Sequence, residues 1–338
     1  MKFNMGENIC IDAGSEYTSI YISGKGLVLR EHSAICRRIN TGKIIAVGDE
    51  ASSAEERLPK TLKIIRPIQN GVICDIKAAK DLLSLLINKV RSNKLIKPRI
   101  MISVPGEITE VEGRAVVDTV MQAGARQVII VPAPVVSALG AGCDVTIARG
   151  LMTLDIGAEK TEMAAISLCH PVISKTLKMG ANSFTEDLKV FLRKKYNLET
   201  GTHTAEKAKI TLGALSPVPA KTIDICGADI STHLPRKITV STTDISDIYE
   251  ERLDKIAKLI KESLDEIPPE LAGDILSDGI LLVGGGAKLD GIADKLRIKS
   301  GIKIYTAENP ELCNIKGTGL AFEHIDELPD IVQSYHNL

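Results

Sequence analysis

The sequence lacks an excess of charge of either sign. It has 42 Lys and Arg residues against 43 Asp and Glu residues, and its formal net charge is -1 at pH 7. Aromatic residues make up only 3% of the chain, tryptophan is absent, and no run of basic or aromatic side chains stands out. Proteins that bind nucleic acid usually carry a basic patch or stripe. We therefore expect no nucleic-acid partner.

Paired cysteines are lacking as well. The seven cysteines are odd in number, widely separated and nowhere arranged as Cys-x-x-Cys. This distribution favours buried, reduced thiols over a disulfide framework or a zinc site. They are Cys10, Cys36, Cys74, Cys143, Cys169, Cys226 and Cys313.

Long apolar runs are also absent. No segment approaches the roughly twenty apolar residues that a membrane span requires. The first ten residues, MKFNMGENIC, are too short and too weakly amphipathic for an anchoring helix. We expect a protein that stays in the cytoplasm.

The chain does contain enough apolar material for two hydrophobic cores. It has 338 residues, of which 44% are hydrophobic, and this suits two domains of ordinary size. The segments NICIDAGSEYTSIYI and MTLDIGAEKTEMAAI each predict two short strands around a glycine-containing turn. The two copies align residue by residue as an internal repeat. Asp12, Gly14, Glu16 and Thr18 match Asp155, Gly157, Glu159 and Thr161.

Predicted strands and helices alternate along the rest of the chain, which is typical of an α/β fold. RIMISVP, QVIIVPAP and GILLV predict buried strands, and Leu82, Leu83, Leu86 and Val90 lie on one face of a predicted helix. A second helix, ERLDKIAKLIKESLDEI, is expected to end at Pro268 and Pro269. The region from about 215 to 243 predicts a smaller, strand-bearing subdomain.

Glycine-containing turns are the first sign of a phosphate site. A turn without a side chain lets backbone N–H groups approach a phosphate, and an Asp at the end of the first strand can hold a metal or its water. Gly284, Gly285 and Gly286 follow a predicted buried strand and precede a helix, so backbone there can approach a base or a phosphate. Alone, the three glycines would more often form a plain strand-to-helix turn.

The order hairpin, hairpin, glycine turn resembles the actin, Hsp70 and sugar-kinase superfamily, and most closely the bacterial actin-like cell-shape proteins of the MreB type. Segments such as GKGLVLREHSA, VPGEITEVEGRAV, TAEKAKI and KGTGLAFEH occur in the family's order along nearly the whole chain. The resemblance implies a duplicated, actin-like (ribonuclease H-like) α/β fold whose two domains clamp ATP or ADP with Mg²⁺. Domain I would be residues 1–148 and 318–338, with subdomain IB at about 31–74; domain II would be 149–317, with subdomain IIB at about 182–245.

The resemblance also implies the site residues. Asp12 and Asp155 would face the metal through water, Gly180 would lie beside the ribose and phosphates, and Glu206 and Lys209 would border the adenosine. Without the other motifs, a surface ion pair would be the better interpretation of Glu206 and Lys209, which lie one helical turn apart. The implied nucleotide-binding set is Asp12, Gly14, Ser15, Glu16, Tyr17, Gly157, Ala158, Glu159, Gly180, Glu206, Lys209, Gly284, Gly285, Gly286 and Lys288.

Glu112 matches the family's water-orienting glutamate, whose carboxylate can accept a hydrogen bond from the attacking water. Thr109 and Glu112 also have the spacing of a capping box at the start of a helix. From these residues alone the cap is the favoured role.

Lys160 marks the main departure from the family. The family's second hairpin has the sequence D-I-G-G-G-T-T-E, and here Ala158, Glu159 and Lys160 replace two glycines and the first threonine, a second water-positioning group. Lysine only donates hydrogen bonds, so hydrolysis is expected to be slowed or lost, although the ammonium could still contact a β- or γ-phosphate. The alternative is neutral change that leaves a slow ATPase. The implied catalytic set is Glu112, Asp155 and Lys160.

Further departures affect the phosphates and the metal. A carboxylate about 4 Å from a phosphate costs roughly 1 kcal/mol in water and about 4 kcal/mol at an effective dielectric of 20. Glu16 and Glu159 must therefore point away, pair with Lys160 or weaken ATP binding. Ser15, Glu16 and Tyr17 replace Thr, Ala and Asn of the family, and Asn182 replaces an Asp, which puts metal affinity in question.

The resemblance implies filaments as well as nucleotide. Family members form paired protofilaments on the inner membrane face and guide cell-wall synthesis, so the implied partners are the chain itself, a paralogue, the membrane surface, and cell-shape and cell-wall synthesis proteins. Leu95 and Ile96 lie where the family has a membrane-inserting loop, and each nearby cation contributes about 1 kcal/mol at an anionic surface. An ordinary solvated loop is the alternative. The flanking cations are Arg91, Lys94, Lys97 and Arg99.

Four functions compete at this stage. A nucleotide-gated cytoskeletal protein that is peripheral on the inner membrane face is favoured. A sugar-kinase type phosphotransferase would need a sugar-site motif, and a chaperone-like ATPase would need a peptide-binding domain. The altered hairpins favour the fourth, a degenerate member that copolymerises with or regulates an active paralogue.

Overall fold

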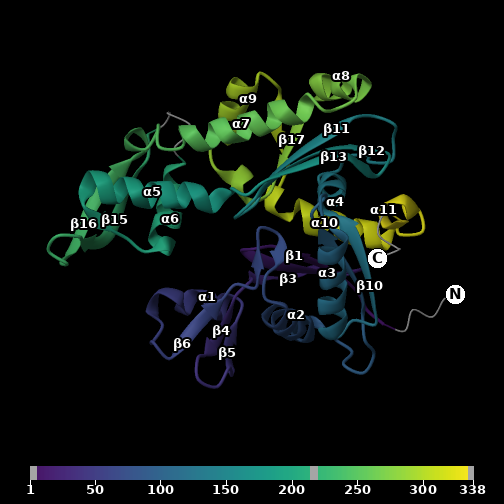
Figure 1. The fold of residues 1–338 in the computed structure, drawn as a ribbon, viewed down its shortest axis with the longest axis horizontal. Coiled ribbons are helices and arrows are strands. Elements are labelled where there is room, and N and C mark those ends of the chain that lie inside the picture. Colours follow the sequence, from purple (N-terminus) through teal and green to yellow (C-terminus); the bar gives the residue numbers. More distant parts are fainter. Residues whose placement is uncertain (1–5, 214–219, 334–338) are drawn as a thin grey trace. The chain divides into compact units, whose positions relative to one another are not determined.

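The structure is a computed structural model that describes residues 6–213 and 220–333 (Figure 1). The chain divides into two compact units, each of which is described by itself. Unit 1 comprises Met1–Thr153, Ala164–Lys175 and Leu312–Leu338, and unit 2 comprises Leu154–Met163 and Thr176–Glu311. The domain and subdomain boundaries proposed from the resemblance stay predictions. The expectation for the first five residues and part of that for the 215–243 region fall outside the described residues.

The first hairpin opens a five-stranded sheet in unit 1, with strand order β10-β9-β1-β2-β3. As predicted, β1 (Asn8–Ala13) pairs antiparallel with β2 (Tyr17–Ile22), and β2 continues antiparallel into β3 (Gly26–His32). The two predicted buried strands are β9 (Arg99–Val104), parallel to β1, and β10 (Gln127–Pro132), parallel to β9.

Helices cover both faces of this sheet. Helices α2 (Ile76–Val90) and α3 (Glu110–Gln122) form one core with alternate residues of β1, such as Ile9 and Ile11. On the opposite face the Cys10 thiol donates to the Thr318 carbonyl of α10 (Cys313–Glu323) at 3.4 Å. Helix α10 packs against α4 (Ala133–Gly140) so closely that a Cβ at Gly140 would lie 1.9 Å from the Cys313 carbonyl oxygen.

Smaller elements complete unit 1. Strands β4 (Ile35–Arg38), β5 (Ile44–Val47) and β6 (Leu62–Ile65) form a three-stranded sheet beside α1 (Asp49–Ala54) and the 3₁₀ turn η1 (Glu55–Arg57). Strands β7 (Ile68–Gln69) and β8 (Val72–Ile73) form a short hairpin, and α11 spans Pro329–Gln333.

The second hairpin opens a five-stranded sheet with order β13-β12-β11-β17-β18, and the division between the units runs through β11, β12 and β13. The predicted strands are present as β11 (Leu151–Ile156), β12 (Thr161–Ser167) and the fully buried β17 (Ile280–Val283). After β17 come the 3₁₀ turn η3 (Gly285–Lys288), α9 (Ile292–Ser300), β18 (Ile304–Thr306) and η4 (Pro310–Leu312), and β13 spans His170–Leu177.

Unit 2 also contains a small sheet and four further helices among its described residues. The small sheet consists of β14 (Leu198–Glu199), β15 (Thr222–Asp229) and β16 (Pro235–Ser241). Along the chain, α5 (Ala181–Tyr196) precedes β14, α6 (Thr202–Leu212) lies between β14 and β15, and the 3₁₀ turn η2 (Thr242–Asp244) follows β16. Helix α7 (Glu250–Leu264) ends a few residues before the predicted end at Pro268. Pro269 begins the next helix, α8 (Pro269–Asp278). Proline suits the first turn of a helix, where its missing N–H has no intrahelical acceptor.

The cysteines are only partly buried. Cys10, Cys36, Cys169 and Cys313 are buried, Cys143 is half-buried, and all seven are free thiols. Cys74 and Cys226 are exposed, so the expectation of burial is wrong for these two. Among the helices of residues 6–213 and 220–333, none combines the length and apolar character needed to cross a membrane.

Candidate nucleotide-binding site

The two hairpins close in the same way. The Gly14 N–H donates to the Tyr17 carbonyl at 3.0 Å, and the Gly157 N–H donates to the Lys160 carbonyl at 2.9 Å. A Cβ at Gly14 would lie 2.9 Å from the Tyr17 oxygen, and one at Gly157 would lie 3.2 Å from the Lys160 oxygen. The internal repeat is therefore a repeat of backbone geometry, and Tyr17 and Lys160 occupy equivalent positions.

The second hairpin is fixed to the start of α5. The Ala181 and Asn182 N–H groups donate to the Gly157 and Ala158 carbonyls, each at 2.8 Å. A Cβ at Gly180 would lie 2.5 Å from the Gly157 carbonyl oxygen. Gly180 is thus required by close approach of two backbone segments, and the first N–H groups of α5 already have acceptors.

The glycine turn after β17 lies against the end of β11. Gly284 has φ +86°, and a Cβ there would meet Asp155 Oδ1 at 2.2 Å and the Ile156 carbonyl oxygen at 2.6 Å. A Cβ at Gly286 would lie 2.3 Å from Ile156 Cγ2, whereas the space around Gly285 is open. Asp155 and the hairpin therefore lie beside this turn. Gly284 and Gly286 have no room for a side chain, whereas Gly285 has.

Lys209 lies at the centre of the next contact, between α6 and α5. It is only 4% exposed, and its Nζ donates to the Ala181 carbonyl and to Thr185 Oγ1, each at 3.0 Å, and to Glu206 Oε2 at 2.8 Å. Thr185 Oγ1 also donates to the same carboxylate oxygen. The interpretation as a surface ion pair is wrong, because all three ammonium hydrogens have buried or partly buried acceptors. Lys209 holds Glu206, whose side chain is 38% exposed, against the first turn of α5.

Lys160, directly before β12, forms an ion pair with Glu162 of that strand. Lys160 Nζ lies 2.5 Å from Glu162 Oε2, and the two side chains are 18% and 3% exposed. Sequence analysis missed Glu162 and Thr185 as partners. The two-residue spacing between Lys160, which directly precedes β12, and Glu162 is a local signal that could have identified that pair, whereas no local pattern links Thr185 to Lys209.

The altered side chains of the first hairpin have partners within unit 1. Glu16 Oε1 lies 3.4 Å from Arg66 Nη1 and 3.6 Å from His32 Nε2. Tyr17 stacks on His32 with ring centroids 4.4 Å apart, and the Arg30 guanidinium lies 3.8 Å from the Tyr17 centroid. Glu16 was expected to point away, pair with Lys160 or weaken ATP binding; the structure instead pairs it with Arg66.

Ser15 and Glu112 also have local roles. Ser15 Oγ accepts from the Gly71 N–H at 3.4 Å. The capping box of α3 is confirmed: Glu112 Oε2 accepts from Thr109 N–H at 3.0 Å and from Thr109 Oγ1 at 2.7 Å. The carboxylate of Glu112 therefore stabilises the start of α3, and its role toward water stays a prediction.

Lys288 and the loop before β9 lie on the surface. Lys288 pairs with Glu311 at 2.7 Å. Leu95 is 95% exposed, and Arg91 Nη2 donates to the carbonyls of Asn93, Lys94 and Ile96 at 3.0–3.3 Å. Arg99 donates to Gln127 and lies over the Phe322 ring, so Lys94 and Lys97 are the exposed members of the expected four cations, whereas Arg91 and Arg99 are half-buried.

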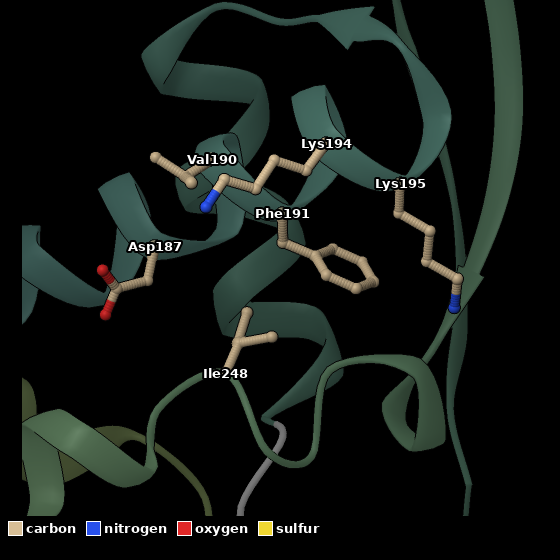
Figure 2. Close-up of a pocket in the computed structure, with 6 residues that line it drawn as sticks. All are labelled: Asp187, Val190, Phe191, Lys194, Lys195 and Ile248. Atoms are coloured by element: carbon tan, nitrogen blue, oxygen red, sulfur yellow. The ribbon is translucent and has the colours of Figure 1, made fainter.

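A separate groove of about 370 Å³ lies on the second half of α5 and the segment before α7 (Figure 2). In Figure 2 the Phe191 ring lies between Lys194 and Lys195, with Asp187 to the left of the ring and Ile248 below it. Asp187 is bound by Arg252 through two hydrogen bonds of 2.8 Å. None of the predicted nucleotide-binding residues lines this groove.

The side chains around Asp155 are suited to a magnesium ion that keeps several of its waters. Among the described residues, no group of three or more His, Cys, Asp or Glu side chains is arranged to hold a metal. Asp155 supplies one carboxylate beside the glycine turn. Mg²⁺ keeps several waters and takes one or two carboxylates together with substrate phosphates, so a site with Asp155 fits such an ion.

Comparison with known sequences gives one family across nearly the whole chain. The family model described as MreB/Mbl protein matches residues 6–330. The cell shape-determining protein Mbl of Bacillus cereus is 37% identical over 324 residues, which cover 95% of this chain and 97% of that protein. The cell shape-determining protein MreB of Escherichia coli is 35% identical over 326 residues, 94% of each chain.

Solved structures show the same fold. The crystal structure of MreB5 of Spiroplasma citri bound to ADP is similar with a TM-score of 0.91 and 30% identity, over 96% of this chain and 98% of that one. The MamK double helical filament is similar in fold, with a TM-score of 0.78 and 20% identity over 94% and 99% of the two chains. The predicted actin-like α/β fold is confirmed, and the chain belongs to the MreB/Mbl family.

Proposed function

We propose that this protein binds ATP or ADP and assembles into cytoskeletal filaments that support cell shape, and that it hydrolyses ATP slowly or not at all. The family and the structure of MreB5 with ADP support nucleotide binding. The observation that carries the proposal is the cluster of Asp155, the hairpin turn at Gly157, Gly180 and Gly284, where backbone approaches backbone too closely for side chains.

Within unit 2, the chemistry suits a nucleotide from two sides. The Gly157 turn offers a small backbone surface to phosphate, and Asp155 would hold Mg²⁺ through water; the ion would neutralise phosphate charge. Glu206, fixed by Lys209 and Thr185, can accept hydrogen bonds from ribose hydroxyls. Gly285, which has open space around it, leaves room for a flat base.

Slow hydrolysis follows from Lys160. Its ammonium is paired with a carboxylate that is 3% exposed, and it has no acceptor for a hydrogen of the attacking water. Moving the ammonium to a phosphate would separate it from Glu162 at an electrostatic cost. We expect the pair to remain closed in the nucleotide complex and water to lack its second positioning group.

The test is to measure phosphate release and filament sedimentation together, with ATP and Mg²⁺. We expect the wild-type protein to pellet with ATP and to release little phosphate. Lys160→Thr restores a hydroxyl and is expected to raise phosphate release by about a hundredfold, the lower end of the range for a positioned acid–base group. The matched control Lys160→Met removes the charge without supplying a hydroxyl and should leave the rate low.

Glu112→Gln separates the two roles of Glu112. Glutamine keeps the capping box but is a weaker acceptor for water, so a change in phosphate release without loss of stability would assign Glu112 to hydrolysis. If the wild-type protein already hydrolyses ATP and Glu112→Gln stops it, Lys160 is a tolerated variation and the proposal of slow hydrolysis is wrong. Failure of the wild-type protein to bind ATP or ADP in calorimetry would refute nucleotide binding itself.

The ion pair of Lys160 also favours a second candidate, a member that copolymerises with an active paralogue and uses nucleotide only structurally. Mixed sedimentation separates the two, because this protein would pellet only in the presence of the paralogue. We further propose that filaments lie on the inner membrane face, where they would meet cell-shape and cell-wall synthesis proteins. Leu95 supports this, and Leu95→Ser should weaken pelleting with anionic vesicles.

A further inference from the structure

Tyr249, directly before α7, carries a buried hydroxyl for which residues 6–213 and 220–333 offer no hydrogen-bond partner. The side chain is 0% exposed, and its ring packs edge-on against Phe184 of α5 with centroids 5.1 Å apart. Phenylalanine would fill the same space without burying a polar group. A buried hydroxyl that lacks a partner destabilises the folded protein, so its presence requires an explanation.

The cluster beside Phe184 contains an unused acceptor. Thr185, the next residue in α5, donates to Glu206 Oε2, and Lys209 contacts the same oxygen. No described residue donates a hydrogen bond to Glu206 Oε1. An unused donor and an unused acceptor thus lie beside the same turn of α5.

The charges around Tyr249 single out Glu206. Burial, followed by the carboxylates of Asp187 and Glu206, raises the pKa of Tyr249 above its ordinary value, so both acids act on the phenol. The oxygens of Asp187 each accept a hydrogen bond of 2.8 Å from Arg252. Glu206 is the acid that keeps one oxygen without a donor among the described residues, and its side chain is the more exposed of the two, at 38% against 21%.

We propose that Tyr249 is a positioning residue of the nucleotide site, whose hydroxyl donates to Glu206 when that carboxylate turns to accept the hydroxyls of a bound ribose. The inference rests on the proposed nucleotide binding. On turning, Glu206 exchanges the bond from Thr185 for one from Tyr249, and its charge stays hydrogen-bonded in both positions. A carboxylate held in this way selects ribose over deoxyribose, because a deoxyribose leaves it with an unused acceptor.

The experiment measures ATP and 2′-deoxy-ATP binding by calorimetry for the wild-type protein, Tyr249→Phe, Glu206→Gln and the double variant, with thermal unfolding of each protein without nucleotide. Tyr249→Phe is expected to lower ATP affinity about tenfold, the value of one hydrogen bond to a charged group. It should also narrow the preference for ATP over 2′-deoxy-ATP. Without nucleotide its melting temperature should stay the same or rise, because an unpaired hydroxyl has been removed.

Two comparisons make the result specific. The double variant should bind ATP no more weakly than Glu206→Gln alone, since the hydroxyl acts through Glu206. Tyr196→Phe, which removes a hydroxyl from the far end of α5, should leave both affinities unchanged. A purely structural hydroxyl would instead lower the melting temperature of Tyr249→Phe without changing the nucleotide preference.

The inference is overturned if Tyr249→Phe binds both nucleotides like the wild-type protein, or if the effects of the two substitutions simply add. A wild-type protein that binds neither nucleotide would overturn the proposed function, whatever the variants do. The two failures are therefore distinct.

Discussion

Replacing Gly284 by alanine is the most direct test of how the glycine turn is built. Two effects act at this residue. Its φ of +86° with ψ of 167° lies in a region that is essentially restricted to glycine, which costs about 1–3 kcal/mol for alanine. The new Cβ would also lie 2.6 Å from the Ile156 carbonyl oxygen and 2.8 Å from its carbon, and overpacking of this kind costs about 1–3 kcal/mol. We expect Gly284→Ala to destabilise unit 2 by about 2–6 kcal/mol, the sum of the two effects.

The neighbouring glycine is the matched control. A Cβ at Gly285 meets no heavy atom within 4 Å, and its φ is not positive. Gly285→Ala should therefore stabilise the protein slightly, by about 0.4–1 kcal/mol, because it reduces the freedom of the unfolded chain. If Gly285 lies beside the nucleotide base as proposed, the same substitution should lower nucleotide affinity.

Urea unfolding followed by far-UV circular dichroism measures both variants, since the chain has no tryptophan to report by fluorescence. The two compact units can unfold in separate transitions, so the midpoint of each transition is compared with that of the wild-type protein. Equal midpoints for the two variants, or a lower midpoint for Gly285→Ala, would refute the packing argument.

Two further predictions concern the contacts of α5. Lys209→Met removes a buried ammonium and leaves its three acceptors without that donor. It should lower the free energy of unfolding by about 2 kcal/mol, which is less than for a fully buried ion pair, because Glu206 can turn to water. In the same urea unfolding experiment, the control Lys207→Met, at an exposed lysine, should have no effect. The hydrogen bond from Lys195, followed by those from Ser241, holds the pKa of Asp244 well below its ordinary value, so its contribution is present above about pH 4 and is lost as the pH falls further. Asp244→Asn should therefore cost about 1 kcal/mol at pH 7, as expected for a lost cap, and progressively less as the pH falls from 4 to 2; an equal cost at pH 7 and pH 2 would contradict this assignment.

The repeated hairpins were predictable because their signals are local. The glycine and the alternating strand residues fix a tight antiparallel pair within about ten residues, and the structure closes both turns with the same hydrogen bond. The capping box of Glu112 was equally local, since its two partners lie three residues apart. The exposure of Cys226 follows from alternation along β15, where Ile225 is buried, and the composition alone did not show it.

Contacts between distant segments could not be predicted from one sequence. The burial of Lys209 depends on Thr185 and Ala181, which lie on another helix, and helical spacing by itself indicates only that Glu206 and Lys209 share a face. The end of α7 was predicted a few residues too late, and the start of α8 was missed, because a proline pair is compatible both with the end of one helix and with the start of the next.

The geometry of the two turns supports the proposal that this chain binds nucleotide but hydrolyses it slowly. Both turns keep the glycine and the closing backbone hydrogen bond, and these depend on the absence of a side chain. At the equivalent positions that follow, Tyr17 stacks on His32 and Lys160 pairs with Glu162, so neither presents a small neutral hydroxyl. Phosphate binding by backbone needs only the first feature, whereas alignment of an attacking water needs an acceptor side chain. If nucleotide binds as proposed, this chain should therefore hold ATP unhydrolysed for longer than a Lys160→Thr variant does.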